Sequence, residues 1–337
     1  MVVNHIRVHM TSPSNSCLPD SESIRTTWQK LAGIVKQTPV FTSETLNRNT
    51  GSKLFFKCEN FQKAGAFKFR GASSALLHIS DEQAARGVCT HSSGNHAQAL
   101  ALAAKIRGIK AFIVMPENAP EVKVNAVKDY GGHITFCMPT LEARESTLEE
   151  VRKDTGSSFI HPYNNYHIIR GQAGCFFEML QQMDEEPDYI IAPVGGGGLL
   201  SGTILTAKYF SKRTRVIGAE PQMANDAWKS FREKRFIPSE SPQTIADGLK
   251  TSLGSKTYPI IMEHADDIIT ATEEGIIDAM FLVWERMKIL IEPSAAVPLA
   301  ALMENPEKFK NKKTGIILSG GNTDLRRIPW MEKRFHH

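Results

Sequence analysis

The chain has 337 residues, of which 41% are hydrophobic and 23% charged, an ordinary composition for a globular protein large enough for two domains. Forty Lys and Arg against 36 Asp and Glu leave a net charge of +4, spread along the chain, so neither nucleic acid nor an anionic membrane is needed as a partner. No apolar run approaches the ~20 residues of a membrane span, and the N-terminal stretch lacks the apolar segment of a secretory signal. We therefore expect a cytoplasmic protein with a small-molecule substrate, and no nucleic-acid or membrane partner.

The five cysteines are odd in number and far apart: Cys17, Cys58, Cys89, Cys137 and Cys175. They form neither a CxxC pair nor a zinc-binding spacing. Reduced thiols are the simplest interpretation, and four of them have apolar or small neighbours, so we expect buried small hydrophobic residues.

The N-terminal segment 1–20 is rich in Ser, Asn and Pro, and we expect it to be a disordered tail. The first helix should begin near Asp20 or Ser21. Its apolar face is predicted from four positions at helical spacing: Ile24, Trp28, Leu31 and Ile34.

From there, short apolar runs alternate with amphipathic stretches. The sequence predicts strands at 53–58, 87–91, 110–115, 133–137, 158–161, 188–193, 215–220, 267–270 and 315–319. It predicts helices at 96–107, 121–130, 141–153, 199–210 and 273–287. This alternation is typical of an α/β protein with two open twisted, mostly parallel sheets covered by helices, and hence of two domains. Ligands bind such sheets at the carboxyl ends of the strands, so chemistry is expected in the strand-to-helix turns.

The first such turn, 61–71 (FQKAGAFKFRG), places Lys68 between two aromatic residues at the start of a helix. Burial lowers the pKa of an ammonium group, and a partly neutral amine can form a Schiff base. The alternative is a lysine whose stem covers apolar surface while its charged end stays in water.

The second turn, 91–96 (HSSGNH), puts two hydroxyls, a glycine and an asparagine at a helix N-terminus, which suits a carboxylate. Ordinary capping by Ser93 or Asn95 is the alternative. The third turn, GGGG at 195–198, follows an apolar strand and opens a helix, the arrangement of a phosphate cradle rather than a mere tight turn. It matches neither the dinucleotide nor the nucleoside-triphosphate glycine motif.

The fourth turn, 319–322 (SGGN), offers a serine hydroxyl for a ring nitrogen, although a simple turn is its default interpretation. Together, an amine, a phosphate cradle and a ring-facing hydroxyl suit a phosphorylated aromatic aldehyde. Pyridoxal phosphate fits that description and acts as an electron sink for chemistry at an amino-acid Cα.

From about Trp28 to Leu325, the chain resembles the fold-type II pyridoxal-phosphate enzymes, and among them the group of serine racemases and serine/threonine dehydratases. The resemblance is carried by segments 57–71, 90–96 (THSSGNH), 195–198 and 318–322 (LSGGN), and the stretch 283–293 is most similar to animal serine racemases. It implies a fold of the tryptophan synthase β type. It also implies a large cofactor-binding domain at 21–87 and 165–337, and a small domain at 88–164.

The resemblance also implies individual roles. Lys68 would hold pyridoxal phosphate as an internal aldimine and act as the base on one face of Cα, and Ser93 would be the acid/base on the other face. Asn95 would bond the ring hydroxyl oxygen of the cofactor, and Ser319 would face the ring nitrogen. The remaining cofactor contacts would come from Phe67, Gly195, Gly196, Gly197 and Gly198. The substrate carboxylate would be surrounded by Ser92, Ser93, Asn95 and His96.

Proton groups on both faces of Cα suit a serine racemase, with accompanying β-elimination of serine to pyruvate and ammonia. Tyr163, after His161-Pro162, is the aromatic residue more usual in dehydratases, so the alternative is an L-threonine, L-serine or 3-hydroxyaspartate dehydratase. An aspartate racemase is disfavoured because the triple-serine run of those enzymes is absent. A non-catalytic cofactor-binding protein is disfavoured because Lys68 and Ser93 are both present.

The resemblance extends to a divalent cation, Mg²⁺ or Ca²⁺/Mn²⁺, held by Glu220, the carbonyl of Ala224 and Asp226. Spacing alone would equally allow a strand-end Glu and a helix-capping Asp without an ion. Animal serine racemases also bind a nucleotide between subunits. The matching positions here are Asn95, Gln98 and Tyr130, whereas Ala64 replaces a common Thr. ATP activation and a homodimer are thus further expectations.

Overall fold

The computed structural model describes residues 18–332. Most of the predicted tail, and Cys17, therefore lie outside the described residues. Within them the chain forms ten strands: β1 (Val40–Phe41), β2 (Lys53–Cys58), β3 (Val88–His91), β4 (Ala111–Pro116), β5 (His133–Cys137), β6 (Ser158–Phe159), β7 (Tyr189–Pro193), β8 (Arg215–Pro221), β9 (Asp267–Ala271) and β10 (Lys313–Leu318).

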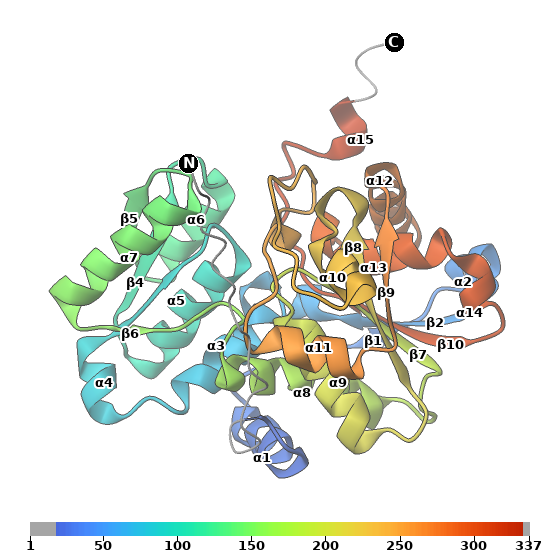
Figure 1. Cartoon of the computed structure of the whole chain (residues 1–337), viewed down its shortest axis with the longest axis horizontal. Helices are drawn as coiled ribbons and strands as arrows, with labels where there is room; N and C mark the ends of the chain where they lie inside the picture. The colour runs from blue at the N-terminus through green and yellow to red at the C-terminus, as the bar shows by residue number, and fades with distance from the viewer. Residues whose placement is uncertain (1–17, 333–337) are drawn as a thin grey trace.

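The strands make two sheets. One has the order β1-β2-β10-β7-β8-β9 and is parallel except for β1, and the other has the order β5-β4-β3-β6 and is parallel throughout. In Figure 1 the four-stranded sheet lies on the left and the six-stranded sheet on the right, so the prediction of two mostly parallel sheets is confirmed.

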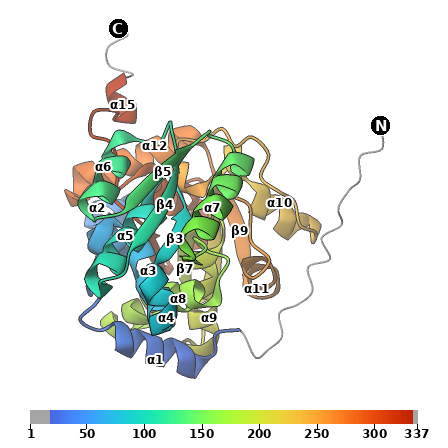
Figure 2. The ribbon, with the colours of Figure 1, turned by 90° about the vertical axis from the view of Figure 1, so that its left-hand side faces the viewer.

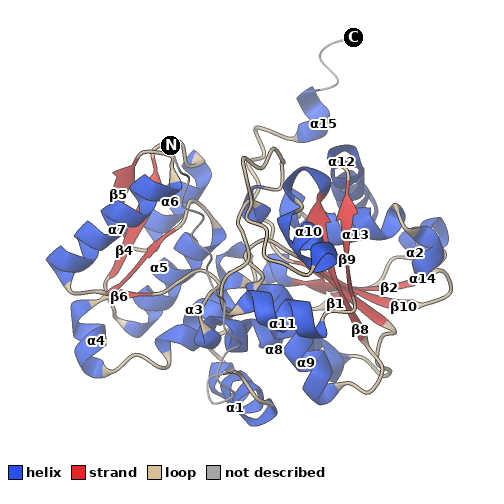
Figure 3. Ribbon diagram, viewed as in Figure 1, coloured by secondary structure: helices blue, strands red, loops and turns tan. Residues whose placement is uncertain are grey.

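Helices surround both sheets, as Figure 3 shows by colour. The α-helices are α1 (Ser21–Leu31), α2 (Glu44–Thr50), α3 (Lys68–Leu76), α4 (Asp81–Arg86), α5 (Asn95–Arg107), α6 (Glu121–Asp129), α7 (Leu141–Thr155), α8 (Tyr166–Gln182), α9 (Gly198–Phe210), α10 (Asp226–Glu233), α11 (Thr257–His264), α12 (Glu273–Leu282), α13 (Pro293–Met303), α14 (Pro306–Phe309) and α15 (Pro329–Glu332). Among the described residues, none of these helices is both long and apolar enough to cross a lipid bilayer.

Alternating residues of the central strands build two cores. Along β7, Tyr189 and Ile191 pack with α12 and α13 on one face of the six-stranded sheet, whereas Ile190 and Ala192 pack with α8 and α9 on the other. Both faces of this parallel sheet are therefore covered, as its continuous apolar strands require.

The four-stranded sheet lies between α5 and α7, which Figure 2 shows on its two sides. Helix α3 packs against both α8 and α5, and so connects the two halves of the molecule. The chain passes between the halves twice, before α4 and before α8. The domain limits at 87/88 and 164/165 stay a prediction.

All nine predicted strands exist, although β6 is two residues shorter than expected. The first helix begins as predicted, because Asp20 accepts a hydrogen bond from the Ser23 N–H at 2.8 Å and forms a capping box with Ser23. The inclusion of Ile34 was wrong: α1 ends at Leu31, and the Ile34 and Val35 N–H groups bond back to the Leu31 carbonyl. The helix predicted at 273–287 ends at Leu282 and continues as one π-helical turn.

The four cysteines within the described residues are free and buried, as expected. Burial raises the pKa of each thiol, so they act as small apolar side chains rather than as nucleophiles.

Candidate active site

The four turns singled out from the sequence lie at one edge of the sheets. They follow β2, β10 and β7 in the large sheet and β3 in the small sheet, at the carboxyl end of each strand. Since these strands run parallel, their carboxyl ends share one edge, where ligands of α/β proteins bind.

Backbone hydrogen bonds join the first turn to the fourth. The Phe67 N–H donates to the Ser319 carbonyl at 3.0 Å, and the Gly321 N–H donates to the Gly65 carbonyl at 2.9 Å. Ala64 and Gly65 both have positive φ, +56° and +68°, which turns the chain sharply before α3. The position of Lys68 is thus set by the end of β10 as well as by its own helix.

Lys68 is the first residue of α3 and is half-buried. Its Nζ donates to the Pro162 carbonyl at 3.0 Å and lies 5.2 Å from the centre of the Phe67 ring. Burial lowers the pKa of Lys68 to about 8, with a smaller opposing effect of Glu292. The lowered pKa agrees with the desolvation expected from the sequence, and the reactivity of the amine stays a prediction. Phe69 does not enclose the amine, since its ring packs in the core of the small sheet.

The glycine loop has no room for side chains. A Cβ at Gly196 would overlap the Tyr163 ring, and one at Gly197, where φ is +84°, would lie 2.7 Å from Ile261. The Thr257 hydroxyl holds the loop by donating to the Gly196 carbonyl at 2.8 Å. Because α9 begins at Gly198, its first N–H groups have no partner within the helix. The glycine loop and these N–H groups therefore suit the binding of a phosphate.

The turn before α5 holds the residues assigned to the substrate carboxylate. Ser92 Oγ accepts a hydrogen bond from the Gly94 N–H at 3.2 Å, and Ser93 is partly accessible. His96 Nε2 lies 3.1 Å from the Ile160 carbonyl, so this nitrogen carries the proton and Nδ1, which has no partner, carries a lone pair. Burial lowers the pKa of His96 to about 3. The neutral imidazole therefore cannot donate to a carboxylate through Nδ1, and only the backbone N–H of His96 remains suited to that role.

Asn95 bridges the two sheets. Its Nδ2 donates to Glu292 Oε1 at 2.6 Å, and its Oδ1 accepts from Asn322 Nδ2 at 3.0 Å. Nearby, Lys123 of α6 forms an ion pair with Asp247, so a second polar contact joins the same two halves. Asn95 was predicted at the site from the sequence but Glu292 was not, since its only signal was an acidic residue directly before the helix-opening Pro293. The carbonyl of Pro162 was not predicted either, because no side-chain pattern reveals a backbone acceptor.

The predicted cation ligands lie near the carboxyl end of β8, with Glu220 in the strand and Ala224 and Asp226 in the segment that follows. Glu220 is 1% exposed and Asp226 is 4% exposed. The Glu220 carboxylate accepts hydrogen bonds from the Ala227 and Trp228 N–H groups, while neither Asp226 oxygen has a hydrogen bond of good geometry. Burial and the charge of Asp226 raise the pKa of Glu220 well above its ordinary value, and burial raises that of Asp226 to about 6, with smaller opposing effects of Ser239 and Lys229.

In the part of the chain that the structure describes, neither carboxylate forms an ion pair with a basic side chain. Two buried carboxylates that repel one another are unfavourable, and a divalent cation would relieve this. Oxygen ligands from Glu220, Asp226 and the buried Ala224 suit Mg²⁺ or Ca²⁺. Clusters of three or more His, Cys, Asp or Glu suited to a metal do not occur within residues 18–332.

The predicted nucleotide positions belong to adjoining helices. Asn95 and Gln98 are one turn apart on α5, and Tyr130 ends α6, which packs against α5. Gln98 is 3% exposed, so this side chain is less accessible than a nucleotide contact should be.

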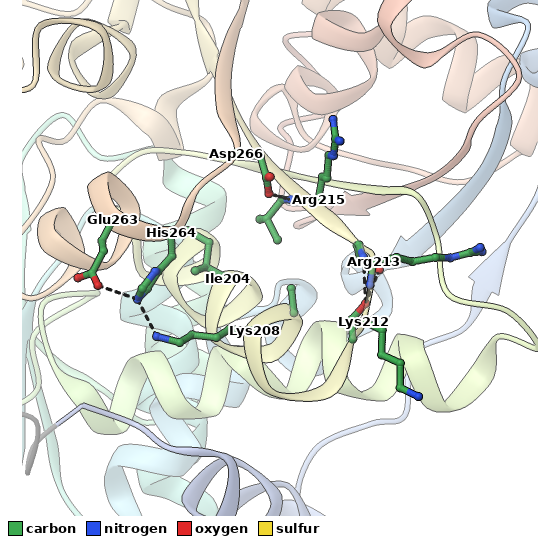
Figure 4. Close-up of a pocket in the computed structure, with 12 residues that line it drawn as sticks. Ile204, Lys208, Lys212, Arg213, Arg215, Glu263, His264 and Asp266 are labelled. Carbon is green, nitrogen blue, oxygen red and sulfur yellow. Dashed lines mark hydrogen bonds and ion pairs between the residues drawn. The ribbon is translucent and has the colours of Figure 1, made fainter.

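A surface hollow of about 450 Å³ lies away from the site, beside the start of β8 and the ends of α9 and α11. Figure 4 shows that Lys212, Arg213 and Arg215 point in different directions there, while Lys208 bonds His264. Because these cations do not converge, the hollow is no anion site comparable to the glycine loop.

A lysine amine of lowered pKa beside a glycine cradle for a phosphate is the arrangement of an enzyme that holds a phosphorylated aldehyde cofactor covalently. Comparison with known proteins agrees: the chain belongs to the family of pyridoxal-phosphate dependent enzymes, whose model matches residues 31–320.

Three relatives illustrate the match. The chain is 47% identical over 312 residues to serine racemase of Dictyostelium discoideum, covering 91% of this chain and 96% of the relative. It is 46% identical over 313 residues to beta-hydroxyaspartate dehydratase of Paracoccus denitrificans, covering 93% and 99%. The structure of maize serine racemase superposes with a TM-score of 0.89 at 45% identity, covering 94% of this chain and 97% of that one.

Proposed function

We propose that the protein is a serine racemase that also eliminates water from serine to give pyruvate and ammonia. The observation that carries this proposal is the amine of Lys68, whose pKa burial lowers to about 8 and which the Pro162 carbonyl orients. An amine with this pKa is deprotonated often enough near neutral pH to serve as a base. The high identity to several serine racemases supports the choice of substrate.

Lys68 and the glycine loop would hold pyridoxal phosphate, which when bound would supply the electron sink that stabilises negative charge at Cα. The N-terminus of α5 binds the substrate carboxylate through Ser92 and backbone N–H groups, including that of His96. Lys68 takes the α-proton on one face, and Ser93 gives a proton on the other, which inverts the centre. Elimination needs only Lys68 as the base and a proton for the departing hydroxyl, which leaves as water. The enamine that results is hydrolysed by water to pyruvate and ammonia.

The experiment that tests this proposal is incubation of the purified protein with L-serine, with D-serine and pyruvate quantified in the same samples. We expect both products. Pyruvate without D-serine would contradict the racemase and leave a dehydratase.

A second candidate is a 3-hydroxyaspartate dehydratase, favoured by Tyr163. Its ring lies against Gly196 and its Cβ against Gly198, and burial raises the pKa of its hydroxyl. A relative of this activity is 46% identical to the chain. Release of keto acid from 3-hydroxyaspartate much faster than from serine would favour this candidate. Under the first proposal, Tyr163→Asn should raise the ratio of D-serine to pyruvate. Tyr209→Asn is the control, because Tyr209 lies at the end of α9 opposite to the glycine loop.

We further propose that Glu220, Ala224 and Asp226 hold Mg²⁺ or a similar divalent cation. The proposal is supported by the two buried carboxylates, which raise the pKa of Glu220, and by the Asp226 oxygens, which have no hydrogen bond of good geometry among the described residues. ATP binding at Asn95, Gln98 and Tyr130 remains a proposal from the resemblance alone, and the buried state of Gln98 does not favour it. Activity assays with and without ATP test it.

We also propose that the protein is a homodimer of the cytoplasm. The homodimer rests on the resemblance, and sedimentation velocity tests it. Free, buried cysteines at all four described positions support a reducing compartment. Fractionation of cells that express the protein tests this location.

A further inference from the structure

Glu292 is a buried acid for which the proposed reaction has no role. It is 2% exposed and is the N-cap residue of α13. Its Oε1 accepts from Asn95, whereas Oε2 is buried without a hydrogen-bond partner among the described residues. An incompletely bonded buried carboxylate costs stability, and such groups require an explanation.

Glu292 and Asn322 hold the Asn95 amide from its two ends. Glu292 takes one N–H of Nδ2, and Asn322 donates to Oδ1. Asn322 is fixed in turn, because its Nδ2 also donates to the Ala64 carbonyl at 2.8 Å. A primary amide has two N–H donors, so one donor of Asn95 remains for a ligand, and its direction is set by these neighbours.

The same carboxylate touches the turn that follows β10. The Glu292 N–H donates to the Gly320 carbonyl at 3.0 Å, and a Cβ at Gly320 would lie 2.5 Å from Glu292 Oε1. Glu292 therefore lies between Asn95 and the Ser319 turn, the two elements expected at different atoms of one pyridine ring. It also faces three charged groups, Lys68, Lys123 and Asp247.

We propose that Glu292 is a positioning residue of the cofactor site, which together with Asn322 orients the Asn95 amide so that its remaining N–H meets the ring oxygen of pyridoxal phosphate. This inference rests on cofactor binding at Lys68, but it does not depend on which amino acid reacts.

The test measures the affinity of the cofactor-free chain for pyridoxal phosphate. Glu292→Ala should weaken binding about tenfold, because the charge-assisted bond that orients Asn95 is lost. Glu292→Gln keeps an acceptor oxygen and should restore most of the affinity. Asn322→Ala should act in the same direction as Glu292→Ala, and remains informative if the latter folds poorly. Glu273→Ala is the matched control, since Glu273, like Glu292, has one carboxylate oxygen that accepts a hydrogen bond and one without a partner among the described residues, but its donor is the Ile245 N–H instead of Asn95.

The decisive comparison repeats these variants in an Asn95→Ala background. If Glu292 acts through Asn95, its further removal should change affinity less than twofold there, and should no longer shift the visible absorbance spectrum of the loaded protein. An equal loss in both backgrounds, or no greater loss than for Glu273→Ala, would overturn the inference. Because serine is not used, a wild-type chain that binds the cofactor but does not turn over serine would contradict the proposed function alone.

Discussion

Two sets of buried charges differ in how completely they are paired. The first, here the ion cluster, consists of Lys57, Glu59, Arg70 and Glu178. Arg70 donates to both oxygens of Glu59 at 2.8 Å, and Lys57 donates to Glu178 at 2.6 Å. The second, here the cleft set, consists of Lys68, Glu220, Asp226 and Glu292. Within residues 18–332, three of its carboxylate oxygens have no hydrogen bond of good geometry.

The ion cluster behaves as a structural unit. Although burial alone would raise it, Arg70 holds the pKa of Glu59 below its ordinary value, so both groups stay charged. In the cleft set burial is not offset, so the pKa of Lys68 falls to about 8 and that of Glu292 rises to about 7. We infer that the fully paired charges of the ion cluster stabilise the fold, whereas the incompletely paired charges of the cleft set are available to bind a cofactor, substrate or cation.

The largest effect is expected for Lys68→Ala. Racemisation and elimination should both fall by about 10⁴-fold, because the attachment point of the cofactor and the base are lost together. Rate measurements with L-serine test this, and Lys208→Ala, a lysine bonded only to His264 at the distant hollow, is the control. Substantial residual turnover would show that Lys68 is neither the attachment point of the cofactor nor the base.

Arg70→Met should be the most damaging change in the ion cluster. It leaves Glu59 and Glu178 buried without their cation and should lower the free energy of unfolding by about 3–5 kcal/mol. Urea denaturation measures the change, and Arg152→Met, which breaks an exposed pair with Glu149, should cost less than about 1 kcal/mol. Equal effects of the two variants would contradict the structural role of the cluster.

Ser93→Ala should separate the two reactions. Without a proton group on the second face of Cα, D-serine formation should fall at least about 10²-fold, while pyruvate formation from L-serine continues in part. Ser146→Ala on α7, whose hydroxyl bonds only its own helix, is the control. A parallel loss of both products would mean that Ser93 does not act only as the second-face group.

Mg²⁺ should stabilise the protein through Glu220 and Asp226. A cation that binds only the folded chain, at about 100 times its Kd, contributes about 2.7 kcal/mol, which should raise Tm by a few degrees. Because the folded pKa of Asp226 is raised to about 6, protons compete with the cation, and the Tm increase should be larger at pH 7.5 than at pH 5. Asp226→Asn should abolish the increase, whereas exposed Asp278→Asn should not; an unchanged increase in Asp226→Asn would place the cation elsewhere.

The smallest effect is expected for the contribution of Lys68 to the pH dependence of the free energy of unfolding in the cofactor-free chain. Its folded pKa of about 8 lies below the ~10.4 of an unfolded lysine, so the unfolded chain binds more protons between these values. The free energy of unfolding should therefore rise from pH 8 to pH 10. Relative to Lys68→Met, the wild type should be less stable at pH 7 and closer in stability at pH 10. An unchanged difference in urea midpoints would show that Lys68 is not desolvated.

The strands and the four turns could be predicted because each is a local pattern: an apolar run followed by Gly, Ser or Asn. Helix α8 could not, since 11 of its 17 residues are buried and its apolar residues show no single face. The partners of Asn95 and Lys68 were also hidden, because Glu292 lies 197 residues from Asn95 and Pro162 lies 94 residues from Lys68. Such contacts depend on how the sheets meet, which spacing along the chain does not encode.

The most direct measurement is borohydride reduction of the cofactor-loaded protein, followed by peptide mapping by mass spectrometry. Reduction makes the bond between a lysine and the cofactor aldehyde permanent. The account predicts a single labelled residue, Lys68, and no label in Lys68→Ala. A label on Lys63 or Lys123, or a protein that binds no pyridoxal phosphate, would contradict it.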